Sequence, residues 1–277
     1  MNDELLARIA DALERIAPVP HAEADLAVHP AYVWNGSVAQ AVESFAPASF
    51  ALLSGIDEQK GRLLENTRRH AEGLPAHDLL LWGARGTGKS ASVGAVVAEL
   101  QDQGSTLALM QCTADHLETL PELFTLLRHV ERPFILFIDD LGFDETSSGA
   151  DARVLRSLLD GGASARPANV RLYVTSNRRH IVPRHLTEQD DPINKRDVVD
   201  DKMALSDRFG LSLGFHMIDQ DAYLAIVEGY ARHYGLSFDG ADAVQWATQR
   251  GSRSGRVAWQ YVTELAGREG KTLKASS

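Results

Sequence analysis

The chain has 277 residues, and its 28 Lys and Arg against 38 Asp and Glu give a net charge of −10. A hydrophobic content of 44% excludes disorder over the whole chain, and the single cysteine, Cys112, excludes an internal disulfide. No apolar run is long enough to span a bilayer. The acidic balance disfavours wholesale coating of nucleic acid. The acidic N-terminus is unlike a signal peptide, so we expect a cytoplasmic protein.

We expect residues 1–50 to form a helical extension. Within it, apolar residues recur at helical spacing between residues 3 and 16, which predicts an amphipathic helix that ends before Pro18. This helix packs either on its own chain or on a partner, and we favour its own chain. Residues 31–36 are apolar and carry an Asn-Gly turn signal, but their pattern indicates no particular element.

Residues 51–218 alternate between short apolar runs and helical stretches. Continuous apolar runs are typical of strands that are covered on both faces, as in a parallel sheet. We expect an α/β fold, with strands at 78–82, 106–112, 134–138 and 170–174 and helices including 91–101 and 152–159.

Residues 219–277 show no strand pattern. Helices are expected at 220–235, 241–250 and 256–266, which would form a small all-helical lid, and the last residues, 270–277, read as a loose tail. Cys112 ends an apolar run and is expected in the core.

A phosphate-binding motif follows the first of these strands. The pattern G-x-x-x-x-G-K-[ST] is matched by Gly83, Ala84, Arg85, Gly86, Thr87, Gly88, Lys89 and Ser90. The glycines let the backbone N–H groups turn towards phosphate oxygens, and the following helix adds its positive N-terminal dipole. Lys89 is expected to reach the β- and γ-phosphates, and the Ser90 hydroxyl to bind Mg²⁺.

Carboxylates follow the apolar strand at 134–138, which indicates a Walker B pattern. Side chains at the carboxyl ends of parallel strands meet in the crevice where α/β sheets bind ligands. We expect Asp139 to hold Mg²⁺ and Asp140 to polarise the attacking water. Asn177, at the end of the strand at 170–174, is a candidate for holding this water or the γ-phosphate.

The order of these features resembles the AAA+ ATPases. Leu53-Ser54-Gly55-Ile56-Asp57 resembles their adenine-side segment, with Ile56 against the nucleotide. Asn177 matches the sensor 1 position, Ser206-Asp207-Arg208-Phe209-Gly210 resembles the box that carries the arginine finger, and Gly255-Arg256-Val257-Ala258 resembles sensor 2. The resemblance covers roughly residues 50–266. It is strongest to an uncharacterised bacterial group called domain of unknown function number 815, through residues 137–141, 175–180 and 206–211.

The resemblance implies a P-loop αβα sandwich with the Asn177 strand between the Walker A and Walker B strands, followed by a helical lid. It also implies homo-oligomers with ATP between neighbours. Arg208 would then reach the γ-phosphate of the adjacent subunit, and Arg256 the nucleotide of its own subunit, with Arg253 as a competitor. Either arginine could instead form a surface ion pair. Many AAA+ proteins have Asp-Glu at Walker B, and the shorter Asp140 predicts slow turnover.

Two charged stretches leave alternatives open. The basic residues at 178–185 could contact nucleic acid, an acidic partner or a neighbouring subunit, and we favour the subunit. The acidic stretch at 187–207 is either a solvated loop or a partner-binding insertion. The histidines form no metal-binding spacing, so no zinc site is expected.

Together these features predict an ATPase that hydrolyses Mg²⁺-ATP at a subunit interface and drives a conformational change or the remodelling of an unknown protein partner. One alternative is an ATP-dependent switch or loader with little turnover. A less favoured alternative is a P-loop kinase, against which the helical tail and the Arg208 box argue.

Overall fold

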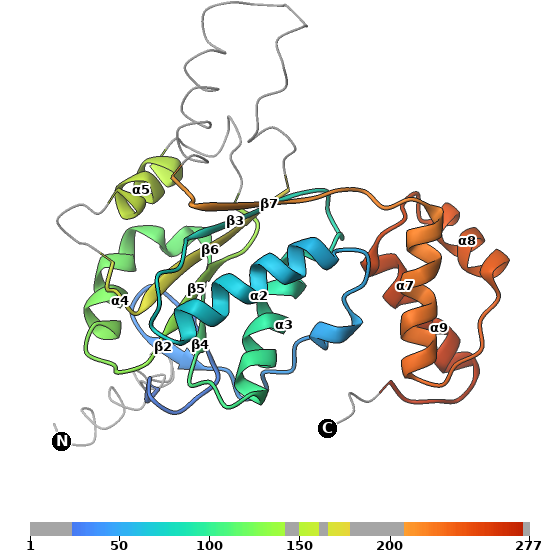
Figure 1. Cartoon of the computed structure of the whole chain (residues 1–277), viewed down its shortest axis with the longest axis horizontal. Coiled ribbons are helices and arrows are strands. Elements are labelled where there is room, and N and C mark those ends of the chain that lie inside the picture. Colours follow the sequence, from blue (N-terminus) through green and yellow to red (C-terminus); the bar gives the residue numbers. More distant parts are fainter. Residues whose placement is uncertain (1–23, 142–149, 161–165, 178–207, 274–277) are drawn as a thin grey trace, which may run out of the picture.

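The computed structural model describes residues 24–141, 150–160, 166–177 and 208–273. The helix predicted within residues 3–16, the basic residues at 178–185 and the acidic stretch at 187–207 lie outside these ranges, as do the last four residues. The described part of the chain forms an α/β sandwich with a helical lid at one side (Figure 1).

One seven-stranded sheet forms the centre of the sandwich, with the strand order β2-β1-β4-β5-β6-β3-β7. All neighbouring strands are parallel except β1 and β2. The position of β6 between β3 and β5 confirms the predicted strand order. The strands are β1 (Ala31–Trp34), β2 (Ala39–Ala41), β3 (Leu79–Gly83), β4 (Ala108–Cys112), β5 (Phe134–Ile138), β6 (Val170–Ser176) and β7 (Leu211–Phe215).

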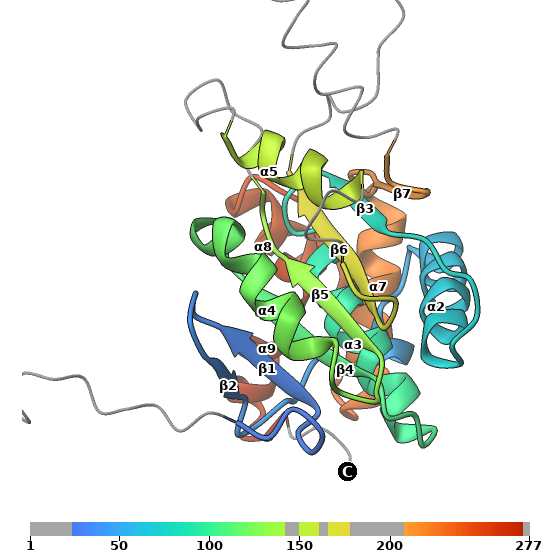
Figure 2. The same cartoon turned by 90° about the vertical axis from the view of Figure 1, so that its left-hand side faces the viewer.

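Helices cover both faces of the sheet, which explains why the central strands are apolar at consecutive positions. In β5, Leu136 belongs to the cluster packed under α4 (Leu120–Leu127) and α5 (Ala150–Leu159). Its neighbour Ile135 belongs to the opposite cluster, under α2 (Asp57–Ala71) and α3 (Lys89–Asp102). Figure 2 shows α4 to the left of the central strands and α2 to their right. Two short 3-10 helices, η1 (Phe50–Leu52) and η2 (Ala114–Thr119), join these elements.

The expected helical extension over residues 1–50 is wrong for residues 31–41, because β1 and β2 lie there and belong to the central sheet. Tyr32 and Trp34 are fully buried, and β1 pairs in parallel with β4. Trp34 Nε1 donates to Thr119 Oγ1 at 2.8 Å. Strands of three and four residues are too short to give a periodic pattern, so their structure depends on the pairing of β1 with β4 and of β2 with β1.

Strand β7 was also not predicted. It lies at the edge of the sheet beside β3, and only Leu213 and Phe215 of its five residues are buried. Ser212 and Gly214 interrupt the apolar run, so that the sequence lacks the signal of a covered strand.

The lid is all-helical in the described residues, as predicted. It consists of α7 (Gln220–His233), α8 (Gly240–Gln249) and α9 (Gly255–Arg268), which enclose a hydrophobic cluster of their own. The helices begin at Asp219, Asp239 and Ser254, whose side chains accept backbone N–H groups of the first turn. The lid therefore has its own core and its own helix caps.

Among the described residues, none of the helices has the length and apolar character needed to cross a membrane.

Candidate functional site

The loop between β3 and α3 takes a backbone course that needs glycine. Gly83 has φ +134, and a Cβ there would lie 1.9 Å from the carbonyl oxygen of Phe215 in β7. Gly86 and Gly88 also have positive φ values, +77 and +96, and Gly88 is the N-cap of α3. Because glycine alone adopts these angles without strain, the loop can curl closely around the start of α3. This is the geometry that the Walker A pattern predicts.

Lys89 lies at the start of α3 with its side chain turned back along the loop. It is 5% exposed, and its Nζ donates to Gly83 O at 3.0 Å, Ala84 O at 2.7 Å and Asn177 Oδ1 at 2.9 Å. Burial lowers the pKa of Lys89, while the charges of Asp140 and Asp139 oppose this shift. The ammonium group is thus held by oxygen acceptors at the end of the sheet.

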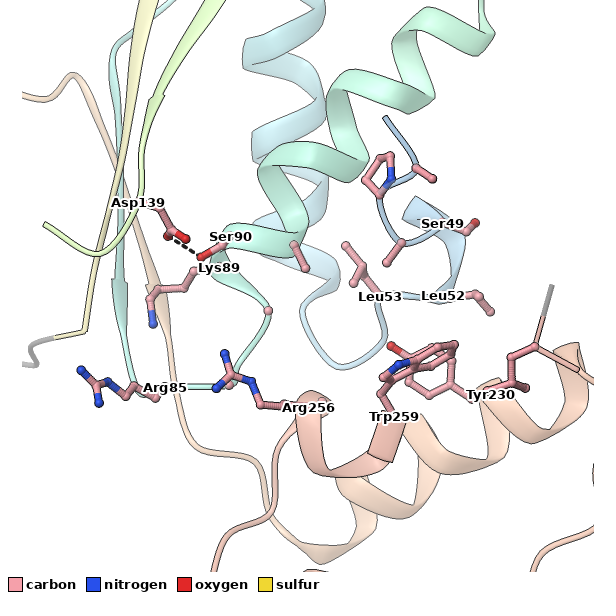
Figure 3. A pocket seen from close by; sticks show the side chains of 18 of the residues that line it. Ser49, Leu52, Leu53, Arg85, Lys89, Ser90, Asp139, Tyr230, Arg256 and Trp259 are labelled. Atoms are coloured by element: carbon pink, nitrogen blue, oxygen red, sulfur yellow. Dashed lines mark hydrogen bonds between the residues drawn. The ribbon is translucent and has the colours of Figure 1, made fainter. Parts of the chain in front are cut away.

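Ser90 and Asp139 meet across the tip of the sheet. Ser90 Oγ donates to Asp139 Oδ1 at 2.5 Å (Figure 3). Thr175 Oγ1 donates to the same oxygen, also at 2.5 Å. A hydroxyl and a carboxylate side by side are the oxygen ligands that Mg²⁺ prefers. The residues present therefore fit a magnesium ion at the position that the sequence predicts.

Asp140 follows Asp139 in an unusual backbone conformation. Its φ of +51 is the one positive value of a non-glycine residue within the described ranges. The backbone N–H donates to Thr175 Oγ1 at 2.8 Å, which ties this residue to β6. Asn177 Nδ2 donates to Asp140 Oδ1, and Arg85 Nη2 lies 3.7 Å from Asp140 Oδ2. Such strain is concentrated at functional sites, so Asp140 is a candidate for chemistry.

A cavity of about 790 Å³ opens between this end of the sheet and the lid. Lys89, Ser90, Asp139, Asp140 and Asn177 line it at the polar end. Figure 3 shows the opposite end, where Leu52 and Leu53 face Tyr230 and Trp259 of the lid. The cavity therefore joins a charged end to an apolar and aromatic end.

Several predicted residues border the loop rather than the cavity. Ile56 is not among the lining residues, and its side chain lies close to Gly88 of the loop. Thr87 donates its hydroxyl to Ala84 O at 2.8 Å, which stabilises the loop. Both side chains therefore contact the phosphate loop rather than the cavity.

Of the two candidate lid arginines, the structure brings Arg256 to the cavity. Its backbone N–H donates to Gly86 O at 3.4 Å, and its side chain lies beside the phosphate loop (Figure 3). Arg253 instead donates to Gln220 Oε1 at 3.4 Å on the lid surface.

Arg208 lies away from this cavity. It precedes β7, which runs parallel to β3. Arg208 therefore lies at the end of the sheet where these strands begin, whereas the phosphate loop lies at the end where they finish. Its Nε donates to Asp160 Oδ1 at 2.5 Å, and its side chain is 31% exposed. Arg208 therefore does not reach the cavity of its own chain.

The sequence analysis did not predict the aromatic residues that line the cavity. Tyr230, His233 and Tyr234 lie at helical spacing on and just after α7, and Trp259 on α9 packs on Tyr230 with 5.3 Å between ring centroids. The spacing of Tyr230, His233 and Tyr234 indicates that they share one helix face. The sequence does not indicate that this face meets the phosphate loop. Only the position of the lid does so.

Known proteins provide a comparison for this arrangement. A family model described as "Protein of unknown function (DUF815)" matches residues 27–269. No significant match is found among curated proteins. Similar solved structures include the RuvB Holliday junction branch migration motor of Thermotoga maritima, with 17% identity and a TM-score of 0.51, covering 82% of this chain and 68% of that one.

The Orc1 protein of Aeropyrum pernix, solved in complex with DNA, is similar to the same degree. It has 18% identity and a TM-score of 0.54, and the match covers 82% of this chain and 66% of that one. At these identities the likeness concerns the fold, which is that of the AAA+ P-loop ATPases.

Proposed function

Because the chain belongs to the DUF815 family and has the AAA+ fold, we propose that it binds Mg²⁺-ATP and hydrolyses it at an interface between two copies of itself. The observation that carries this proposal is the cavity, which joins Lys89, Ser90 and Asp139 at one end to Tyr230 and Trp259 at the other. A nucleoside triphosphate has the same two ends: a charged chain of phosphates and a flat base that stacks on aromatic side chains.

Each residue at the polar end of the cavity would have a different role in phosphoryl transfer. Lys89 would exchange its carbonyl acceptors for the β- and γ-phosphates, and Ser90 and Asp139 would hold Mg²⁺, which neutralises developing charge. Asp140 would orient the attacking water, with Asn177 fixing the position of the carboxylate. Arg256 would reach the phosphates from the lid of the same chain, so that lid movement would follow nucleotide binding.

A second copy would complete the site through Arg208. This side chain lies at the opposite end of the parallel strands from the phosphate loop, so we expect it to act on the nucleotide of a neighbouring subunit rather than on that of its own chain. A guanidinium there would stabilise the charge of the transferring phosphoryl group. The pair with Asp160 would break when the neighbour docks.

The larger consequence would be nucleotide-driven movement. Residues 51–218 would act as the nucleotide-binding core and 219–277 as the lid, with the hinge near Ile218. Hydrolysis would change the angle between them and thereby remodel a partner protein. We favour a protein partner over nucleic acid because the net charge is −10.

Release of phosphate from Mg²⁺-ATP tests this proposal directly. The wild-type chain should release phosphate, and Lys89→Ala should abolish the release while its circular dichroism spectrum stays unchanged. Light scattering with and without a non-hydrolysable ATP analogue should show a nucleotide-dependent oligomer. A wild-type protein that neither binds ATP nor releases phosphate would refute the activity, and a protein that stays monomeric in both conditions would refute the interface.

A nucleotide-dependent switch with little turnover is the second candidate. It is favoured by Asp140, which is one methylene shorter than glutamate and is held by both Asn177 and Arg85. In that case ATP would bind and promote assembly, but steady-state phosphate release would stay at the background level. The same assay therefore separates the two functions.

A further inference from the structure

Arg85 occupies a position of the phosphate loop at which the Walker A pattern requires no particular side chain. Its guanidinium lines the cavity and is 80% exposed, and Nη2 lies 3.7 Å from Asp140 Oδ2. Its charge also contributes to the lowered pKa of Lys89, together with that of Arg256, after the larger effect of burial. Arg85 therefore lies at the phosphate end of the cavity rather than at the aromatic end (Figure 3).

A continuous chain of polar contacts connects Arg85 to Lys89. Lys89 donates to Asn177, Asn177 donates to Asp140, and the other oxygen of Asp140 faces Arg85. The carboxylate that would orient water is thus engaged at both oxygens. As long as Arg85 keeps this position, Asp140 has less freedom to accept a hydrogen bond from water.

The contact between Arg85 and Asp140 is weak compared with what a phosphate offers. Both side chains are more than half exposed, and exposed ion pairs at this distance contribute little. A terminal phosphate carries more charge than a carboxylate, and arginine can bind two of its oxygens at once. A γ-phosphate held by Lys89 would therefore compete successfully for Arg85, whereas ADP has no phosphate at that position.

We propose that Arg85 exchanges Asp140 for the γ-phosphate of bound nucleotide, so that it distinguishes ATP from ADP and frees Asp140 to orient water. This inference rests on the proposed function, because it places a triphosphate in the cavity. Arg85 would then be a third cation from the same chain at the phosphates, beside Lys89 and Arg256. It also makes the release of the water-orienting carboxylate depend on the substrate itself.

Calorimetric titration with ADP and with the β,γ-imido analogue of ATP, both with Mg²⁺, tests the exchange. Arg85→Ala should weaken binding of the ATP analogue about tenfold and change ADP binding less than about twofold. Arg85→Lys, which keeps the charge but not the paired donors, should lose less. Arg62→Ala on the exposed face of α2 removes the same charge away from the cavity and should change neither affinity.

Asp140→Asn supplies the second arm of the test. Removing the competing carboxylate should tighten binding of the ATP analogue, and this gain should be larger when Arg85 is present than in the Arg85→Ala background. An equal loss of ATP-analogue and ADP affinity in Arg85→Ala, or additive effects in the double variant, would overturn the exchange. Wild-type protein that binds neither nucleotide would instead refute the proposed function.

Discussion

The hydroxyl of Ser90 donates to Asp139 Oδ1 at 2.5 Å, which joins the first turn of α3 to the end of β5. These residues come from the two separate motifs that the sequence shows, 49 positions apart. Their contact supports one magnesium site built from both motifs. Loss of either side chain should therefore weaken the magnesium site.

Ser90→Ala should therefore impair the use of Mg²⁺ more than the binding of nucleotide. We expect the Mg²⁺ concentration that half-saturates ATP binding to rise about tenfold, because one oxygen ligand is lost. Nucleotide affinity measured in EDTA should stay unchanged. Ser212→Ala on the exposed edge strand β7 is the matched control. Equal Mg²⁺ dependence of the Ser90→Ala and wild-type proteins would contradict the assignment.

Arg208→Ala should separate binding from turnover. ATP affinity should stay within about twofold of the wild type, because Arg208 lies away from its own cavity, while turnover should fall at least about 100-fold. Mixing Arg208→Ala with Asp140→Asn subunits should restore part of the activity, since each supplies what the other lacks. Asp160→Asn, which removes only the partner of Arg208 within the chain, should not reduce turnover. Absence of rescue between two folded variants would refute the action across an interface.

Trp259 should contribute to binding of the base. Trp259→Ala removes an aromatic wall of the cavity and should weaken ATP and ADP about tenfold alike, because base stacking is independent of the phosphates. Trp259→Phe keeps a ring and should recover most of the affinity. Fluorescence of a labelled ADP measures the affinity for ADP, and displacement of this ADP by ATP measures the affinity for ATP. Unchanged affinity in Trp259→Ala would remove the aromatic end from the nucleotide site.

His70 should make the stability of the protein depend on pH. Burial lowers its pKa to about 4, and its Nε2 lies 3.0 Å from Phe134 O. Between about pH 6.5 and pH 4 the unfolded chain binds a proton that the folded chain does not, so stability is lost as the pH falls through this window. By pH 5 the loss should reach about 2 kcal/mol.

Urea unfolding at pH 7.5 and pH 5 checks this prediction. Other groups also titrate, so the comparison is made with His70→Gln, which keeps a hydrogen-bond donor but does not titrate. The wild type should lose more stability than the variant between the two pH values. The same loss in both proteins would show that His70 does not cause it.

Gly83→Ala should destabilise the whole sheet. Its Cβ would lie 1.9 Å from Phe215 O, and the backbone φ of +134 is itself unfavourable for alanine. We expect a loss of more than about 3 kcal/mol in thermal or urea unfolding. Gly104→Ala, at φ +91 with no atom near the new Cβ, should cost only about 1 kcal/mol for the backbone strain. Similar costs at both positions would show that contact with β7 is unimportant.

Much of the fold follows from local sequence patterns. The runs at 134–138 and 170–174 are apolar at consecutive positions because both faces of β5 and β6 are covered, and this pattern is visible without a structure. The phosphate loop is equally visible, since its glycines are needed for backbone angles that other residues avoid. The strands β1, β2 and β7 could not be found in this way, because they are short or lie at an edge and depend on their neighbours for structure.

The sequence by itself determined the α/β class, the phosphate loop and the two strand-end carboxylates, because each depends on residues close together in the chain. Only the tertiary structure decided that Arg256 rather than Arg253 reaches the cavity, that Arg208 lies at the end of the strands opposite the phosphate loop, and that Arg85 faces Asp140. Arg256 reaches the cavity because the lid packs on the phosphate loop. Arg208 lies away from it because β7 runs parallel to β3, and Arg85 faces Asp140 because of the backbone conformation at Asp140. Residues far apart in sequence meet only where backbone geometry and packing bring them together.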